Sequence, residues 1–134
     1  MTRQLISSGG PFEKIGGYSR AVRVDDHVYV SGSTAVKEGK VVGPGDVAAQ
    51  THQSLSTITL ALQQAGATLA DVVRYRIYLT NIADSAKVLP IFGEYFGDIR
   101  PAGTLVAVSA LISPEMMIEI EVDAIAGSGS MTAR

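Results

Sequence analysis

Residues Ile99–Ala126 read IRPAGTLVAVSALISPEMMIEIEVDAIA, and this stretch decides the fold class. Its two parts, Thr104–Leu111 and Met117–Ala126, have the patterns of strands, and a proline turn precedes each. The first part is small or apolar on both faces, so both faces require cover. The second alternates apolar residues with acids such as Glu119, which predicts one buried face and one face of carboxylates.

The sequence before this stretch predicts three more strands. Ser19–Val24 and His27–Ser31 are apolar runs separated by Asp25-Asp26, a spacing typical of a tight hairpin. Val72–Thr80 alternates apolar residues with arginines and predicts a half-buried strand. The glycines and proline of 39–45 predict a loop, because their spacing fits no phosphate-binding motif.

Two helices are predicted between these strands. Val47–Ala65 has apolar residues at three- and four-residue steps, with Asp46 as N-cap and Gly66 as the glycine that follows the helix. Asp84–Phe96 predicts a helical turn and then a helix from about Leu89, with the next residue, a proline, in its first turn. Helices of this kind bury one stripe of side chains against a sheet.

The order of these elements predicts an α+β sandwich of two layers in a single domain, residues 1–126. Two helices can cover only one face of the sheet, so we expect a second copy of the chain to cover the other. The pattern stops at Gly127, and Gly127–Arg134 predicts a flexible tail.

Composition excludes several classes of site. The 134 residues include no cysteine and two histidines, which excludes disulfides, thiolate metal sites and a three-histidine metal site. The net charge of −2 and the scattered basic residues indicate no nucleic-acid groove. The start lacks the apolar core of a signal peptide and no run is long enough for a membrane helix, so a cytoplasmic protein with no membrane partner is expected.

Several short motifs, in this order and spacing, resemble those of the Rid family (reactive intermediate deaminases, also called the YjgF family). They extend over almost the whole chain and are Ile15-Gly16-Gly17-Tyr18, Val30-Ser31-Gly32, the helix of 47–66 with Gln50 and Gln53-Ser54-Leu55, Pro101-Ala102, and Ile118-Glu119-Ile120-Glu121. The resemblance implies a chorismate-mutase-like fold with a mixed sheet of about six strands, and a homotrimer with clefts between neighbouring subunits. Members of the family hydrolyse imines, the tautomers of enamines such as 2-aminoacrylate, to a keto acid and ammonia. No cofactor or metal is implied.

The resemblance also implies the residues of the cleft. The water-positioning glutamate falls on Glu119, the tyrosine that helps to close the cleft on Tyr18, and the segment that lines its floor on Ser31-Gly32. The arginine that binds the substrate carboxylate falls on Gly103. Positions that carry an asparagine and a cysteine in many members fall on Leu89 and Leu105.

The missing arginine changes the expected substrate. A guanidinium pairs with a carboxylate through two parallel hydrogen bonds, which no other side chain duplicates. Its loss from a cleft costs about 2–4 kcal/mol for a small anionic imine. We therefore expect a wider, more apolar cleft that disfavours 2-aminoacrylate, with Arg20 or Arg100 as candidate replacement cations. Gly103→Arg is expected to restore some activity.

Three functions follow as hypotheses. The first is a hydrolase that acts on an imine, enamine or related labile C–N bond of a small molecule, with Glu119 handling the water. The second is a non-catalytic trimer that binds a small metabolite or a partner protein. The third, a ribonuclease, is disfavoured by the acidic chain. Within the site, cross-strand ion pairs of Glu119, Glu121 and Asp123 with Arg74 and Arg76 would explain these charges without catalysis.

Overall fold

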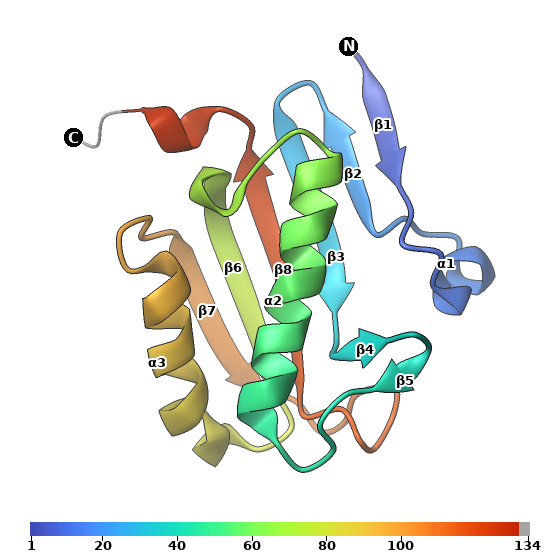
Figure 1. Ribbon diagram of the computed structural model, residues 1–134, viewed down its shortest axis with the longest axis vertical. Coiled ribbons are helices and arrows are strands. Elements are labelled where there is room, and N and C mark those ends of the chain that lie inside the picture. The colour runs from blue at the N-terminus through green and yellow to red at the C-terminus, as the bar shows by residue number, and fades with distance from the viewer. Residues whose placement is uncertain (132–134) are drawn as a thin grey trace.

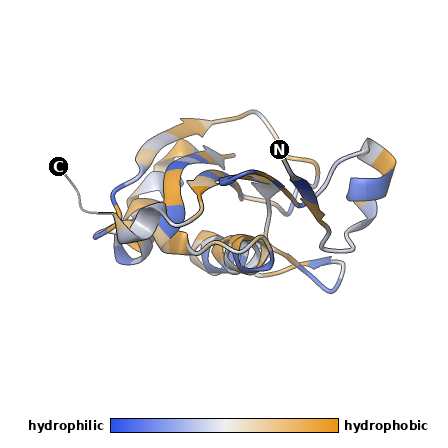
Figure 2. Ribbon diagram, turned by 90° about the horizontal axis from the view of Figure 1, so that it is seen from above, coloured by the Kyte–Doolittle hydropathy of each residue, from blue (hydrophilic) through white to orange (hydrophobic). Residues whose placement is uncertain are grey.

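A mixed six-stranded sheet with two helices on one face forms the molecule (Figures 1 and 2). The computed structural model describes residues 1–131. The strands lie in the order β1-β2-β3-β8-β6-β7, and their bounds are β1 Arg3–Ile6, β2 Ala21–Val24, β3 His27–Ser33, β8 Ile118–Ile125, β6 Val72–Leu79 and β7 Ala102–Ala107. The two long helices are α2, Val47–Gln64, and α3, Ser85–Phe96. The predicted two-layer α+β sandwich is confirmed.

The last strand, β8, occupies the middle of the sheet. It pairs antiparallel with β3 on one side and with β6 on the other, so segments far apart in sequence meet there. β6 and β7 are parallel and are joined through the short helix η2, Ile82–Asp84, and α3. A crossover of this kind is required between parallel strands.

Burial along β8 alternates as predicted. Ile118, Ile120, Val122 and Ala124 are at most 2% exposed and face the helices. The residues between them are only partly buried, on the face that no helix covers. This period of two places three carboxylates of β8 side by side on the open face.

The α2 helix has the predicted ends, and one of its polar residues joins distant loops. The Asp46 carboxylate accepts the Ala49 N–H at 3.0 Å, and Gly66 has a φ of 81°. Gln50 is fully buried; its Nε2 donates to the Glu115 carbonyl at 2.8 Å and its Oε1 accepts the Met117 N–H at 2.8 Å. Gln50 therefore fixes the segment that leads into β8.

The prediction for the second helix was wrong at its start. α3 begins at Ser85 rather than near Leu89, and Pro90 lies in its interior. Proline lacks the N–H that would bond to the Ala86 carbonyl. Because Pro90 and Ala86 are both exposed, water can satisfy that carbonyl, and the helix continues through the proline.

The strand predictions also need corrections. β7 runs from Ala102 to Ala107 rather than over Thr104–Leu111. The alternation in Val72–Thr80 predicts Val73 on the same face as Ile77 and Leu79. A bulge in β6 turns Val73 to the surface, 38% exposed, and places Val72 in the core. Three short elements were not predicted: β1, the helix α1 (Pro11–Gly16), and a separate hairpin of β4 (Val36–Lys37) and β5 (Lys40–Val41) where a loop was expected.

The C-terminal segment is partly structured rather than a flexible tail from Gly127 onward. Residues Ser128–Ser130 form a short 3-10 helix, η3, and the Gly129 N–H donates to the Asp71 carboxylate at 2.8 Å. The remainder of the predicted tail, 132–134, lies outside the described residues. Within residues 1–131, the helices are too short or too polar to cross a membrane.

Candidate functional site

Two of the three acids on the open face of β8 share partners on β6. Arg76 Nη1 lies 3.8 Å from Glu121 Oε1 and 3.4 Å from Asp123 Oδ2, and the Tyr78 hydroxyl donates to Glu121. This hydrogen bond, with burial and the Glu121 charge, raises the pKa of Tyr78. The cross-strand ion pairs considered from the sequence are therefore present for Glu121 and Asp123, which stabilise the sheet.

Glu119 differs from these two acids. It faces Tyr78 in the strand register, and among residues 1–131 it has no basic partner within 4.0 Å. Burial raises the pKa of its carboxyl, the charge of Glu121 adds to this effect, and the charge of Arg20 opposes it. A partly desolvated carboxyl with a raised pKa holds a proton more readily than an ordinary glutamate, which suits a group that must both take and return one.

Gly32 provides the space that Glu119 occupies. A Cβ at position 32 would lie 2.8 Å from Glu119 Cδ and 2.9 Å from its Oε2, closer than real contacts allow. The register of β3 against β8 shifts between Val30 and Ser33, so a bulge presents the Gly32 backbone to the carboxyl. The Ser31 hydroxyl donates to the Ser19 carbonyl at 2.7 Å and fixes the strand beside the bulge. Gly32 thus lies against Glu119, and the role of Ser31-Gly32 in lining a cleft stays a prediction.

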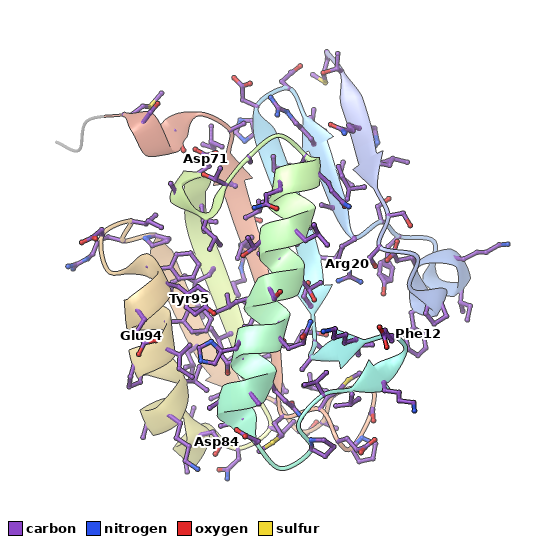
Figure 3. All side chains as sticks on the ribbon, in the orientation of Figure 1. Phe12, Arg20, Asp71, Asp84, Glu94 and Tyr95 are labelled. Atoms are coloured by element: carbon purple, nitrogen blue, oxygen red, sulfur yellow. The ribbon has the colours of Figure 1, made fainter. Side chains whose placement is uncertain are left out.

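Arg20 lies between β3 and α1 (Figure 3). Its Nη1 donates to the Gly32 carbonyl at 2.7 Å and to Ser33 Oγ at 3.2 Å. The guanidinium carbon lies 5.6 Å from the centre of the Tyr18 ring, and Nη2 is 3.4 Å from the Tyr18 hydroxyl. Arg20 therefore links Tyr18, itself 40% exposed, to the backbone of Gly32.

A buried carboxylate, Glu13, supports Arg20 from α1. It is 5% exposed and accepts hydrogen bonds from the Ser7 hydroxyl and from the Ser8 hydroxyl and N–H. Its Oε2 lies 3.9 Å from Arg20 Nε. Burial alone would raise the pKa of Glu13, but the serine hydrogen bonds and the charge of Arg20 outweigh it and lower the pKa. The sequence did not reveal this residue, because its partners lie five and six residues before it in an irregular segment.

The other predicted cleft residues form a second group on the opposite face and edge of the sheet. Leu105 pairs with buried Ile77 and packs against the core, so it faces the helices, as does Gly103 two residues earlier. Leu89 is 49% exposed on α3 and, with Tyr75 and Arg100, lines a cavity of about 420 Å³. Within one chain, this group does not meet Glu119.

The space that an arginine at position 103 would require is occupied. A Cβ on Gly103 would lie 2.7 Å from Cε1 and Cζ of Tyr75. The Tyr75 ring is held by Phe92 and Phe96 of α3, at centroid distances of 4.8 and 5.4 Å. Within one chain, an aromatic ring therefore fills the space of the missing side chain, and the wider cleft between subunits stays a prediction.

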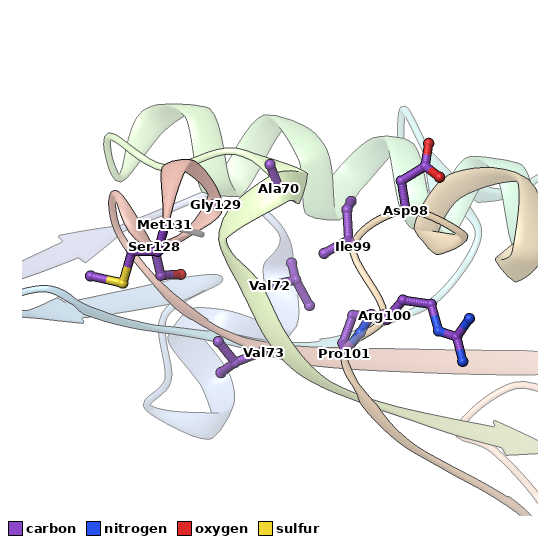
Figure 4. A pocket seen from close by; sticks show the side chains of 10 residues that line it. All are labelled: Ala70, Val72, Val73, Asp98, Ile99, Arg100, Pro101, Ser128, Gly129 and Met131. Atoms are coloured by element: carbon purple, nitrogen blue, oxygen red, sulfur yellow. The ribbon is translucent and has the colours of Figure 1, made fainter. Parts of the chain in front are cut away.

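A further cavity, of about 400 Å³, lies beside η3 (Figure 4). Val72, Val73 and Met131 line it, and the Arg100 guanidinium is directed away from Val72 and Val73. No group of three or more potential metal-ligating side chains was found among residues 1–131. His52 bonds to Tyr95 across the helix layer and His27 stacks near Tyr29 on the sheet, so the two histidines do not form an acid–base pair.

Comparison with known proteins supports one family. The model of the family "Endoribonuclease L-PSP" matches residues 11–126. The chain is 38% identical over 121 residues to the 3-aminoacrylate deaminase RutC of Acinetobacter baylyi, covering 90% of this chain and 95% of that protein. It is 36% identical over 123 residues to a RutC family protein of Pyrococcus abyssi, covering 90% and 95%.

Among solved structures, the chain is similar to a member of the YjgF/YER057c/UK114 family from Mycobacterium tuberculosis. The TM-score is 0.85 and the identity 47%, covering 93% of this chain and all of that one. A Rid family protein from Yersinia pestis aligns with a TM-score of 0.84 at 36% identity, covering 93% and 100%. The fold, the motif order and these likenesses agree, and the chain belongs to the endoribonuclease L-PSP family, also named the YjgF or Rid family.

Proposed function

We propose that this protein is a hydrolase that acts on an imine, enamine or related labile C–N bond. The observation that carries the proposal is the isolation of Glu119. Its two neighbours on the same strand face share the charge of Arg76, and one of them accepts a hydrogen bond from Tyr78, whereas Glu119 has no ion-pair partner within residues 1–131 and burial raises the pKa of its carboxyl. A residue that served only to pair strands would be placed as Glu121 and Asp123 are.

The reaction requires one group that takes and then returns a proton. The Glu119 carboxylate accepts a proton from water as the water oxygen bonds to the imine carbon, and it passes this proton to the imine nitrogen, which gives a carbinolamine. The carboxylate then takes the remaining hydroxyl proton and delivers it to the nitrogen, so that the C–N bond breaks, ammonia leaves and the carbonyl forms. General acid–base catalysis of this kind contributes roughly 100- to 10,000-fold. The 3-aminoacrylate deaminase activity named for the relative from Acinetobacter baylyi is a reaction at a C–N bond of an enamine, which supports this class.

The substrate should differ from 2-aminoacrylate. Gly103 offers no guanidinium, and the Tyr75 ring occupies the space beside it. Leu89 and Leu105 add apolar surface on the same side of the sheet. A small imine that relies on an arginine at this position would lose its carboxylate partner.

The site also requires a second subunit. Leu89, Gly103 and Leu105 lie at the α3–β7 edge, whereas Glu119 and Gly32 meet between the central strands β8 and β3. A homotrimer with clefts between subunits would bring the first group of one chain to the second group of its neighbour. The open sheet face and the exposed β7 edge strand are the surfaces that such an assembly would cover.

The test compares the wild-type protein with Glu119→Gln and Glu121→Gln. Imines are generated in the assay from amino acids by an amino-acid oxidase, and ammonia release is followed against the spontaneous rate. Glu119→Gln should lower turnover by roughly 100-fold or more, because the amide keeps the shape and cannot titrate. Glu121→Gln, which removes a paired acid from the same strand face, should lower it far less.

The contradicting outcomes are equally clear. Turnover that is unchanged in Glu119→Gln would remove the catalytic role. A wild-type protein that binds imine products and releases no ammonia above the spontaneous rate would favour a trimer that binds a small metabolite.

A further inference from the structure

Two side chains of β6 that contact the acids of β8 lean away from Glu119. The strand register places Tyr78 opposite Glu119, yet its hydroxyl donates to Glu121, the next acid along the same face. Arg76 stands opposite Glu121, but its Nη1 lies closer to Asp123 Oδ2, at 3.4 Å, than to Glu121 Oε1, at 3.8 Å. Diagonal contacts of this kind are within reach of long side chains. Of the three acids, Glu119 is therefore the one that receives no donor from β6 within residues 1–131.

This face of the sheet carries more negative than positive charge beside Glu119. In the part of the chain that the structure describes, Arg76 is the only cation that pairs with an acid of β8, and two acids share it. Glu119 and Glu121 are two residues apart on one strand face, a separation of about 7 Å along the strand. Two carboxylates at this distance repel each other, since the Debye length at physiological salt is about 8 Å.

We propose that Glu119 and Glu121 act as a coupled pair of carboxyls, in which Glu121 is a positioning residue that keeps the proton on Glu119. This inference rests on the proposed function and adds Glu121 and Tyr78 to its acid–base step. Tyr78 and Arg76 hold Glu121 as the charged member of the pair, and its charge disfavours a second carboxylate beside it. Glu119 is the member that exchanges its proton with water and with the imine nitrogen.

The other groups around Glu119 do not supply this charge. From β3 it meets Gly32, which has no side chain to ionise. From β6 it faces Tyr78, and the hydrogen bond to Glu121 raises the pKa of this phenol, so that it stays protonated and remains a donor. Burial and then the charge of Glu121 raise the pKa of Glu119, whereas the charge of Arg20 acts in the opposite direction. Glu121 is therefore the neighbouring charge that favours the protonated form of Glu119.

The proposed reaction uses a proton on Glu119 twice. The carboxyl passes one proton to the imine nitrogen as water adds and a second one as ammonia leaves. Such transfers are most efficient when the pKa of the acid–base group lies near the working pH. The charge of Glu121 moves the pKa of Glu119 in that direction.

The experiment follows the Glu119 carboxyl itself by NMR. The assembled protein carries glutamate labelled with carbon-13 at the side-chain carboxyl, and the Glu119 signal is identified by its loss in Glu119→Gln. Glu121→Gln, a change of similar shape at a partly exposed side chain, should shift the titration midpoint of Glu119 to lower pH, because the neighbouring charge is gone. Tyr78→Phe should bring the titrations of the two acids closer together, because Glu121 loses its donor and competes for the proton.

Asp123→Asn is the matched control. It removes another carboxylate that pairs with Arg76, from the same strand face, at four residues from Glu119. Four residues of strand extend about 13 Å, which exceeds the Debye length of about 8 Å. The midpoint of Glu119 should therefore stay near its wild-type value in this variant. The comparison separates the charge beside Glu119 from a general loss of pairing with Arg76.

The pH dependence of turnover provides a second readout. The value of kcat/KM should rise with pH as Glu119 becomes the free base, and Glu121→Gln should shift this rise to lower pH while lowering the plateau only a few-fold. A residue with a merely structural role would lower kcat/KM equally at every pH.

Three results would overturn the proposal. These are an unchanged midpoint of Glu119 in Glu121→Gln, equal shifts in Glu121→Gln and Asp123→Asn, or a kcat/KM profile that Glu121→Gln lowers without shifting. Failure of the proposed function has a different signature. In that case the midpoint of Glu119 moves as predicted while ammonia release never exceeds the spontaneous rate, so the carboxyl pair stands and the hydrolase does not.

Discussion

The carboxyl carbon of Glu119 lies 2.8 Å from the point where a side chain on Gly32 would begin. The two residues are on neighbouring strands, β8 and β3, and a bulge in β3 creates their close approach. Gly32 has an ordinary backbone conformation, so it is required for space and not for a positive φ. The position of the candidate acid–base residue therefore depends on the absence of one methyl group.

Gly32→Ala should displace the Glu119 carboxyl and lower turnover by at least about 10-fold, with a loss of stability of roughly 1–3 kcal/mol. Glu119→Asp shortens the acid by one methylene and relieves the collision. The double variant should therefore be more stable than the sum of the two single changes predicts, measured by chemical denaturation. Strict additivity would show that the two residues do not touch.

Glu119→Gln should change stability in a pH-dependent way. The pKa of Glu119 is raised above its ordinary value of 4.5, so the folded chain holds this charge less readily than the unfolded chain does. The free-energy cost of the Glu119 charge is absent when the carboxyl is protonated in both the folded and the unfolded chain. The cost is present once the pH exceeds the raised pKa of the folded chain. The variant should therefore be more stable than the wild type at about pH 8, with the advantage disappearing as the pH falls below about 4.5. An advantage that stays constant with pH would contradict the raised pKa.

The sequence predicted the central elements of the fold because local signals there agree with tertiary packing. β8 alternates strictly, and α2 has both an aspartate cap and a glycine stop. α1 and the β4–β5 hairpin lack such periodicity, since each is short and mostly exposed. Pro90 misled the helix prediction because a proline on an exposed helix face leaves only a solvent-accessible carbonyl unpaired.

The site was predictable only in part for a related reason. A strand pattern places Glu119, Glu121 and Asp123 on one face, but it cannot show which acid meets Arg76. Which acids pair with Arg76 depends on where its long side chain ends between β6 and β8. The filling of the space at Gly103 by Tyr75 depends in turn on how α3 packs on the sheet, which no spacing in the sequence reports.

Gly103→Arg should not simply restore an anionic site, contrary to the expectation from sequence. A side chain at 103 must displace the Tyr75 ring, which Phe92 and Phe96 hold in place. Gly103→Ala alone should cost roughly 1–3 kcal/mol of stability. In a Tyr75→Leu background the same change should cost less, because the colliding ring is gone. Equal costs in both backgrounds, measured by thermal and chemical denaturation, would place the ring elsewhere in solution.

Sedimentation at micromolar concentration should show a trimer. Disruption of the open face should dissociate it, and Arg76 offers a test, since it forms ion pairs with two acids there. Arg76→Glu places three carboxylates of β8 beside a fourth, which should favour smaller species at low salt and recover partly at high salt. A wild-type monomer would remove the inter-subunit cleft from the proposed function.

Glu13→Gln should destabilise the protein with the opposite pH dependence to Glu119→Gln. The pKa of Glu13 is lowered below its ordinary value of 4.5, because the hydrogen bonds from Ser8 and Ser7 and the charge of Arg20 outweigh burial. The stability that ionised Glu13 contributes is therefore fully present above pH 4.5, and it is lost as the pH falls through the lowered pKa of the folded chain. At about pH 7 the variant should lose roughly 1–3 kcal/mol, as for other buried bonds to a charged group. As the pH falls through the lowered pKa of Glu13 the two proteins should converge. Glu94→Gln, a change at an exposed acid on α3 (Figure 3), should have little effect on stability. If Glu13→Gln were as stable as the wild type at neutral pH, the carboxylate would not hold α1 and Arg20 together, and the positioning of Arg20 would have to come from Gly32 and Ser33 alone.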